Sequence, residues 1–390
     1  MLRYCTHCVM PDTKPDLSFD EQGVCDACRS SELKNQVDWA QREAEFRALV
    51  DAHKGKNPGN YDCIIPVSGG KDSHYQAYLC KKYGLNPLLI HFEPTRRTDL
   101  GRTNLENIRQ FGDVIEFMKN PEVYRKMCIE GFLRVGDHEW PNHVGIFTFP
   151  VRMAVALKIP LIIWGENSQL EYGGPKSARM KNVLDRRWLE EFGGLLGLRV
   201  EDMAGEAAGI TKEDLILYTY PSDDELKAAG INGAFLGYYF KWDARPQVDL
   251  VKEKFGFAVK DDGPVECTFL NYENLDEATY AVHDLLKFVK FGFSRATDHA
   301  CIDIRNGRMT RDEGVKLVEQ YDGKRPVKAI AEFLAYTGMT VEKFDKVVDS
   351  FTDKAIFVTD QSGALVRDGS GDLVKRFTDY SVSAQRSSRS

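Results

Sequence analysis

The residues with the clearest chemical potential lie between an apolar stretch and a helix-like one, in the run Ser68-Gly69-Gly70-Lys71-Asp72-Ser73. Two adjacent glycines allow backbone N–H groups to converge on an anion without interference from Cβ atoms. The start of a following helix adds a partial positive charge. Lys71 can neutralise phosphate, Ser68 and Ser73 can donate hydrogen bonds, and Asp72 can hold Mg²⁺. The run therefore predicts a site for nucleotide phosphates; the alternative is a glycine-rich turn without catalytic meaning.

Four of the nine cysteines form two closely spaced pairs, Cys5-x₂-Cys8 and Cys25-x₂-Cys28, with 16 residues between the pairs. Each pair can chelate a metal from a tight turn, and four thiolates complete a closed tetrahedral zinc site. We expect structural zinc here, with an iron–sulfur cluster or a redox role as the alternative. The other cysteines show no paired spacing and predict buried thiols, although a functional role for Cys128 stays open.

A second polar loop, residues 165–174, follows a strand-like apolar run and holds Glu166, Asn167, Glu171 and two glycines. Beside a phosphate site, Asp72 and Glu171 can share a Mg²⁺ ion, and Asn167 can contact the activated group. A solvated loop without a ligand is the alternative. Its position after a strand favours the functional interpretation.

A third group of charged residues lies near the carboxyl end, between residues 290 and 311. Four arginines, two aspartates and a histidine occur within 17 residues of this stretch. Arginine binds phosphate and carboxylate groups through two parallel hydrogen bonds. We expect the group to bind an acidic nucleotide-sugar, and a structural network of ion pairs is the competing interpretation. The candidates are Arg295, Asp298, His299, Arg305 and Arg311.

We expect a parallel sheet to position the two polar loops at residues 68–73 and 165–174. Apolar runs predict strands at 62–67, 87–92, 113–118 and 159–164, and helical patterns lie between them at 73–83, 102–111, 122–133 and 142–157. Such alternation is typical of an α/β fold with helices on both faces of the sheet. Ligands in these folds bind at the carboxyl ends of the strands. Residues 68–73 and 165–174 follow the first and fourth predicted strands.

The remaining sequence divides the chain into further units. Residues 1–30 form a zinc unit built on the four paired cysteines, 31–60 a helix and linker, and 61–175 the ATP-binding domain. Helical patterns dominate 176–376, which predicts a mainly helical domain for substrate or partner binding, and the Ser/Arg-rich residues 377–390 predict a disordered tail.

Composition limits the classes of partner. Fifty-two basic and 59 acidic residues give a net charge of −7, whereas nucleic-acid enzymes usually carry a basic surface. No apolar run approaches the ~20 residues that a membrane helix needs, and the first residues lack the apolar core of a signal peptide. We therefore expect a cytoplasmic protein without nucleic-acid or membrane partners.

The first run resembles the SGGxDS signature of the ATP-pyrophosphatase (PP-loop) superfamily, whose members cleave ATP between the α and β phosphates. Such members have an adenine nucleotide alpha hydrolase-like parallel sheet. The resemblance implies that adenine lies against the second strand, which makes His91 and Phe92 candidates for the nucleotide pocket. A histidine with a purely structural role at the strand end is the alternative.

The motifs also occur together in one order: Cys-Thr-x-Cys-Val-Met, the SGGKDS run, Gly-Glu-Asn before Glu-Tyr-Gly-Gly, and Arg-Ala-Thr-Asp-His through Gly-Arg-Met-Thr-Arg. In this they resemble the N-acetyl sugar amidotransferase family of bacterial surface-polysaccharide and flagellin-sugar pathways. The resemblance implies ATP-dependent conversion of an acetamido group on a nucleotide-sugar into an acetamidino group. Residue 2 is Leu, so Met1 removal exposes no cysteine nucleophile, and we expect separate glutaminase and cyclase-like subunits to supply ammonia. The rival interpretations are a tRNA-thiolating PP-loop enzyme and a non-catalytic nucleotide-binding scaffold.

Overall fold

A computed structural model describes residues 2–166, 196–206, 208–377 and 380 of the chain. At its centre is a sheet of five parallel strands in the order β3-β2-β1-β4-β5. The strands are β1 (Cys63–Val67), β2 (Pro87–Phe92), β3 (Val114–Phe117), β4 (Leu161–Trp164) and β5 (Asn232–Phe235). The four strands predicted from apolar runs are therefore confirmed, and the fold is α/β.

Alternate strand residues bury in two separate cores, one on each face of the sheet. In β1, Ile64 faces one core, while Cys63, Ile65 and Val67 face the other. Successive side chains of a strand point to opposite faces, so a strand covered on both faces is apolar throughout. This explains why the runs are continuously apolar and do not alternate with polar residues.

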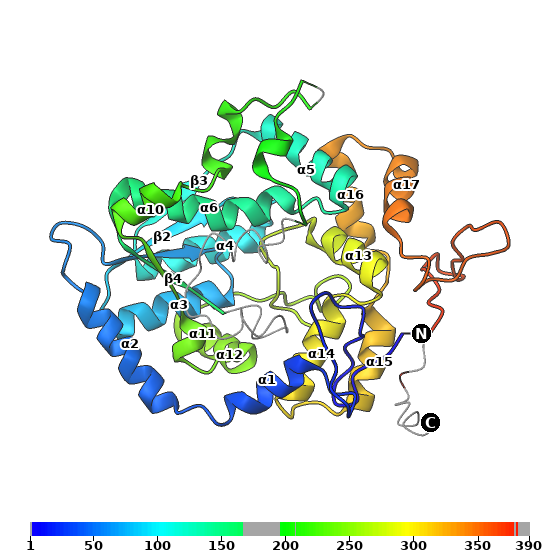
Figure 1. The fold of residues 1–390 in the computed structure, drawn as a ribbon, viewed down its shortest axis with the longest axis horizontal. Coiled ribbons are helices and arrows are strands. Elements are labelled where there is room, and N and C mark those ends of the chain that lie inside the picture. The colour runs from blue at the N-terminus through cyan, green and yellow to red at the C-terminus, as the bar shows by residue number, and fades with distance from the viewer. Residues whose placement is uncertain (1, 167–195, 207, 378–379, 381–390) are drawn as a thin grey trace.

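Helices cover both faces (Figure 1). The first core holds α5 (Pro121–Val135) and α6 (Trp140–Leu157), and α6 runs along the sheet. The second core contains residues of α2 (Trp39–His53), α3 (Lys71–Lys82), α4 (Asp99–Ile108) and the short α11 (Leu236–Tyr239). On the same face, α12 (Ala244–Phe255) packs on α3. Helix α10 (Asp223–Ala229) contacts α6 on the opposite face.

The strand order creates a switch point between β1 and β4. The chain steps from β1 to β2 and β3 through α3 and α4, and then crosses to the other side of β1 through α5 and α6. Connections that leave in opposite directions open a crevice at the carboxyl ends of the two central strands, where such folds bind ligands. Ser68 and Gly165 follow directly after β1 and β4.

The carboxyl-terminal region is helical and joins both the sheet domain and the amino-terminal unit. It contains α13 (Tyr280–Phe291), α14 (Arg295–Arg305), α15 (Arg311–Tyr321), α16 (Val327–Thr337) and α17 (Val341–Phe351). Helices α13, α16 and α17 share a core with Phe132 of α5. Helices α14 and α15 share a core with the cysteine-rich unit, which lies beside them in Figure 1.

Several elements differ from the sequence expectations. The stretch 31–53 was expected as one helix, but the structure has two separate helices, α1 (Asp26–Lys34) and α2. The Asp38 side chain caps α2 by accepting hydrogen bonds from the backbone N–H groups of Ala40 and Gln41. Strand β5 and helix α14 were not expected. Among the described residues, no helix combines the length and apolar character needed to cross a bilayer.

Candidate active site

The Ser68–Ser73 loop connects β1 to α3 and is held in shape by its own hydroxyl groups. The backbone N–H of Ser68 donates to Ser73 Oγ over 2.9 Å, and that of Gly70 donates to Ser68 Oγ over 3.1 Å. Gly69 has φ +85°, and a Cβ there would lie 2.9 Å from the backbone nitrogen of Leu105. Only glycine fits both constraints. Helix α3 begins at Lys71, so its positive end points into the loop.

Lys71 is buried and shared between two carboxylates. Its Nζ lies 2.6 Å from Asp72 Oδ2 and 2.8 Å from Glu273 Oε1. Burial alone would lower the pKa of Lys71, but the charges of Asp72 and Glu273 outweigh it and raise the pKa well above its usual value. Burial also raises the pKa of Asp72; Lys71 opposes that shift and Glu273 adds to it. The lysine is therefore charged and already compensated before any phosphate arrives.

Three cavities meet at Asp72. The first, which we call the strand-end cavity, has a volume of about 390 Å³ and lies at the carboxyl ends of β1, β2, β4 and β5. The second, the arginine cavity, measures about 370 Å³ and lies between α1, α14 and the start of α12. A smaller space of about 80 Å³ lies along the glycine loop. Volumes of a few hundred Å³ suit small-molecule ligands.

The strand-end cavity has an apolar and a polar part. Ile90, Phe92, Phe147, Pro150 and Trp164 supply the apolar surface. The polar lining comes from the loop and α3, from the start of α6, from the end of β4 and from the segment that leads into α13. It comprises Ser68, Asp72, Ser73, Gln76, Asn142, His143, Glu166, Asn274, Asp276, Glu277 and Tyr280. An apolar slot next to a phosphate loop is suited to a nucleotide, whose base is flat and whose phosphates are charged.

His91 and Phe92 were both predicted to line the nucleotide pocket, and the structure separates them. Phe92 lines the strand-end cavity, whereas His91 is not among its lining residues. His91 Nδ1 lies 2.8 Å from the carbonyl oxygen of Val67, and its Nε2 lies 3.4 Å from Arg97 Nη2. Burial lowers the pKa of His91 to about 4. These contacts fit a neutral ring that ties β2 to the end of β1.

The arginine cavity is organised around Asp303 of α14. Asp303 Oδ2 accepts a bond of 2.6 Å from Arg245 Nη2, and Oδ1 accepts one of 2.9 Å from Arg308 Nε. Arg308 Nη1 also donates to Asp243 Oδ2 over 2.7 Å. One carboxylate thus aligns two guanidinium groups along the wall, where their remaining N–H groups can meet a ligand.

Of the five residues predicted from the 290–311 stretch, His299 and Arg305 line the arginine cavity. The others lie among protein partners. Arg295 donates to Tyr280 OH over 2.9 Å, and Asp298 pairs with Lys287. Arg311 donates to the carbonyl oxygens of Cys5 and Cys8, over 3.2 and 3.0 Å, and to that of Tyr380 over 2.7 Å.

The other predicted loop is largely beyond what the structure describes. Asn167 and Glu171, expected near the activated group and the magnesium ion, fall in 167–195, outside the described residues. Glu166, the last described residue before that range, lines both large cavities.

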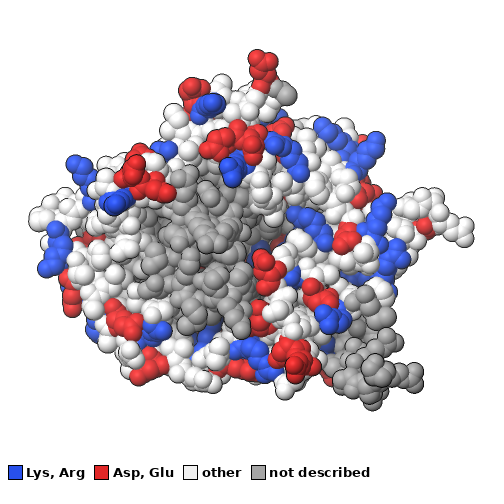
Figure 2. Space-filling view, in the orientation of Figure 1, with Lys and Arg blue, Asp and Glu red and all other residues white. Residues whose placement is uncertain are grey.

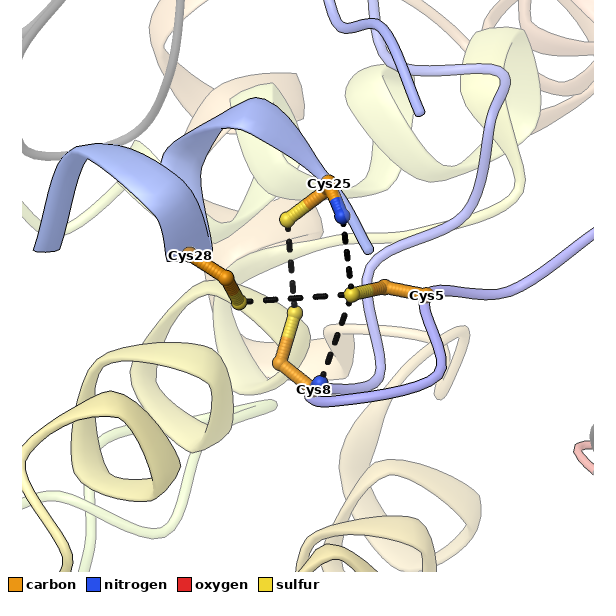
Figure 3. Close-up of side chains that lie close together, drawn as sticks. All are labelled: Cys5, Cys8, Cys25 and Cys28. Carbon is orange, nitrogen blue, oxygen red and sulfur yellow. Dashed lines mark hydrogen bonds between the residues drawn. The ribbon is translucent and has the colours of Figure 1, made fainter. Parts of the chain in front are cut away.

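Four cysteines come together at the amino terminus in the geometry of a metal site (Figure 3). Their Sγ atoms all lie within 4.8 Å of one another; Cys5 and Cys28 are 4.0 Å apart, and Cys8 and Cys25 are 3.8 Å apart. Tetrahedral zinc with Zn–S bonds of ~2.3 Å separates its sulfurs by about 3.8 Å. Backbone N–H groups of Cys8 and Cys25 point at Cys5 Sγ. All four thiols are buried, so the set fits a structural metal.

Sequence reasoning missed Glu273 and Arg245, and it counted Asp303 in the charged stretch 290–311 without naming it as a candidate. Glu273 lies in an irregular segment, and its spacing to Lys71 carries no signal because only the tertiary fold brings the two together. Asp303 and Arg245 carried a weak signal, since both belong to charged stretches next to predicted helices.

Residues 266–368 match the model of a family described as "LPS biosynthesis protein WbpG-like, C-terminal domain". The matched segment includes Glu273, Asp276, Glu277 and all of α13–α17, so it supplies one side of the site. The comparison with curated proteins finds no match.

Proposed function

We propose that the protein is an ATP-dependent amidotransferase of lipopolysaccharide biosynthesis that acts on a nucleotide-activated N-acetyl sugar. The observation that carries the proposal is the loop itself. Its glycines, the positive end of α3 and the buried Lys71 converge at the switch point of a parallel sheet, where two ligand-sized cavities meet. The match of residues 266–368 to an LPS biosynthesis family supports a sugar pathway.

In this proposal the strand-end cavity binds ATP, with adenine against Phe92 and the phosphates on the loop. The arginine cavity binds the nucleotide-sugar, whose diphosphate pairs with Arg245 and Arg308. Asp72 borders both cavities, so the acetamido oxygen can approach the α-phosphorus from the opposite side. Holding two reactants in line accounts for much of the acceleration in such reactions.

The acetamido oxygen forms a bond to the α-phosphorus, and the bond from that phosphorus to the bridging oxygen of pyrophosphate breaks. The product is an O-adenylyl imidate. Ammonia adds to the imidate carbon, the carbon–oxygen bond to AMP breaks, and an acetamidino group is left on the sugar. Lys71 and the N–H groups of the loop neutralise charge on the departing pyrophosphate.

Magnesium fits the residues present. Asp72 is partly buried and borders all three cavities, so its carboxylate is placed to act as a ligand. Asp72 and Glu166 would hold the ion, with Glu171 as a further candidate, and the ion would neutralise phosphate charge. Zinc on the four cysteines is structural and takes no part in the chemistry.

Ammonia is proposed to come from a separate glutaminase. Eight of the nine cysteines are buried, and Cys267 is only partly exposed, so none offers the accessible thiolate of a glutaminase. Cys128 is fully buried, and burial raises the pKa of its thiol. On the face shown in Figure 2, basic and acidic side chains of the described residues are interspersed, which favours a small-molecule acceptor over tRNA.

The test is to incubate the protein with ATP, Mg²⁺, an ammonium salt and a panel of nucleotide-activated N-acetyl sugars, without RNA. Mass spectrometry should detect the replacement of oxygen by NH in one sugar, with equal amounts of AMP and pyrophosphate. AMP formation that requires RNA, or none with any sugar, would contradict the proposal.

A further inference from the structure

A histidine near the start of α6 lines the strand-end cavity and has no role in the adenylation step. His143 lines the cavity together with Ser68, Asp72 and Ser73 of the phosphate loop. Its side chain is 18% exposed, enough to meet a ligand. Beside it, Asn142 of the same helix lines the cavity. The group therefore shares a single space with the site proposed for the α-phosphate.

His143 belongs to a His–Asp–His arrangement in which Asp137 is the central residue. Asp137 Oδ2 lies 3.8 Å from His143 Nδ1, and Asp137 Oδ1 lies 2.8 Å from Nδ1 of His283 on α13. The backbone N–H of Glu139 also donates to Asp137 Oδ1 over 3.0 Å. The two histidine rings meet edge to face, with centroids 5.2 Å apart. Asp137 is buried and hydrogen-bonded to His283, and its second oxygen lies near the His143 ring without a hydrogen bond to it.

The two histidines differ in what their free nitrogens can reach. His143 Nδ1 is buried, lies 3.8 Å from Asp137 Oδ2 and makes no hydrogen bond within the described part of the chain, which leaves Nε2 as the nitrogen able to meet a ligand. His283 makes the shorter contact with Asp137 but is not among the residues that line the cavity. Of the two, only His143 combines a nearby carboxylate with access to the reaction space.

The surroundings favour a neutral ring that can accept a proton. Burial is the main cause that lowers the pKa of His143. The negative charges of Asp137 and Glu139 oppose this shift, and His283 and His138 add to it. These are the charged and titratable groups that face the ring from the α5–α6 turn and from α13. Once the ring gains a proton, the charge of the Asp137 carboxylate, 3.8 Å away, stabilises the cation.

We infer that His143 is the base that deprotonates the nitrogen nucleophile in the second half of the reaction, with Asp137 as the nearby carboxylate that stabilises its charged form. This inference rests on the proposed function. Ammonia forms a C–N bond to the carbon of the protonated O-adenylyl imidate and becomes a substituted ammonium group. His143 Nε2 takes one proton from that group, the C–O bond to AMP then breaks, and the electron pair on nitrogen forms the amidinium. The proton leaves His143 for solvent, and no oxidant or reductant is needed.

The experiment separates the two half-reactions in the full-length protein. The first is measured as sugar-dependent exchange of labelled pyrophosphate into ATP, without ammonia. The second is measured as amidine formation with an ammonium salt as nitrogen source. The variants are His143→Gln, the neighbour control His283→Gln, the distant control His53→Gln, and His143→Ala assayed with and without added imidazole.

In His143→Gln, we expect exchange to stay within about threefold of wild type while amidine formation falls roughly 10²-fold or more, the usual range for loss of a general base. His283→Gln should lose less than about tenfold and His53→Gln should match wild type, since neither residue lines the cavity. Imidazole should restore part of the amidine formation in His143→Ala, with a rate that follows the concentration of neutral imidazole.

Two results would overturn the inference while leaving the proposed function intact. One is amidine formation within about threefold of wild type in His143→Gln. The other is an equal loss of exchange and amidine formation without imidazole rescue, which would make His143 a nucleotide contact or a structural residue. A wild-type protein that shows neither exchange nor AMP formation with any sugar would instead remove the proposed function, and the inference with it.

Discussion

The buried Lys71 at the start of α3 and the partly buried Glu273 in the segment before α13 form an ion pair, with Nζ and Oε1 2.8 Å apart. The pair joins the phosphate loop to the part of the chain that matches an LPS biosynthesis family. Because Asp72 contacts the same ammonium group, two carboxylates compete with any phosphate for one lysine. In the proposed function, nucleotide binding therefore rearranges this contact.

Replacing Glu273 by Gln should tighten ATP binding. The change removes a negative charge next to the phosphate site and frees Lys71, so we expect the Kd for Mg-ATP to fall roughly three- to tenfold. Titration calorimetry measures the effect. Glu332→Gln is the control, because Glu332 forms an exposed pair with Arg96 and lines none of the three cavities. Weaker ATP binding in Glu273→Gln would show that Glu273 supports the bound nucleotide.

Arg311 and Arg308 should give opposite phenotypes when changed to Lys. Arg311 donates from Nε to the carbonyl oxygens of Cys5 and Cys8 and from Nη2 to that of Tyr380, a planar arrangement that Lys cannot reproduce. Arg311→Lys should therefore lower stability by about 1–3 kcal/mol and speed zinc loss. Arg308 lines the arginine cavity, so Arg308→Lys should raise the KM for the sugar and leave zinc in place. Denaturant unfolding, zinc release to a chelator and steady-state kinetics report these effects. A raised sugar KM in Arg311→Lys at wild-type stability would return Arg311 to the substrate site.

Cys25→Ser should remove zinc and destabilise the amino-terminal unit together with α14 and α15, which share its core. Structural zinc can contribute ~10 kcal/mol or more to the folding of such a unit. We therefore expect less than one zinc per chain by elemental analysis and a lower Tm. Cys267→Ser is the matched control, because Cys267 lies outside the cluster. Full zinc content and an unchanged Tm in Cys25→Ser would contradict the structural role.

His91 should make stability depend on pH in a defined window. Burial lowers its pKa from 6.5 to about 4, so the unfolded chain takes up a proton before the folded one does. The free energy of unfolding should therefore fall by up to about 3 kcal/mol as pH drops from about 6.5 to about 4. His91→Gln removes this contribution, so urea denaturation at several pH values should show a shallower decline in the variant. Parallel declines would show that His91 is not buried in its neutral form.

The sequence predicted the elements whose signals are local. The runs that became β1, β2, β3 and β4 are apolar because both faces of the sheet are covered, and the SGGKDS run and paired cysteines carry their chemistry in fixed spacing. Strand β5 was missed because Asn232-Gly233 is typical of a turn, and it pairs only through its neighbour β4.

The sequence could not reveal which charged residues share a site. Tertiary contacts decide that Arg308 faces a cavity while Arg311 clamps the cysteine unit, although both belong to one basic stretch. The same holds for Asp137, His143 and His283, which are brought together by the packing of α13 near the α5–α6 turn.

The most direct test of the central claim is to identify the products of ATP in the presence of an acetamido nucleotide-sugar and Mg²⁺, for the wild type and for Lys71→Ala. Phosphorus NMR should show AMP and pyrophosphate with the wild type and a rate lower by at least about 10²-fold with the variant, while circular dichroism shows both proteins folded. Formation of ADP and inorganic phosphate, or unchanged AMP formation in Lys71→Ala, would contradict the account.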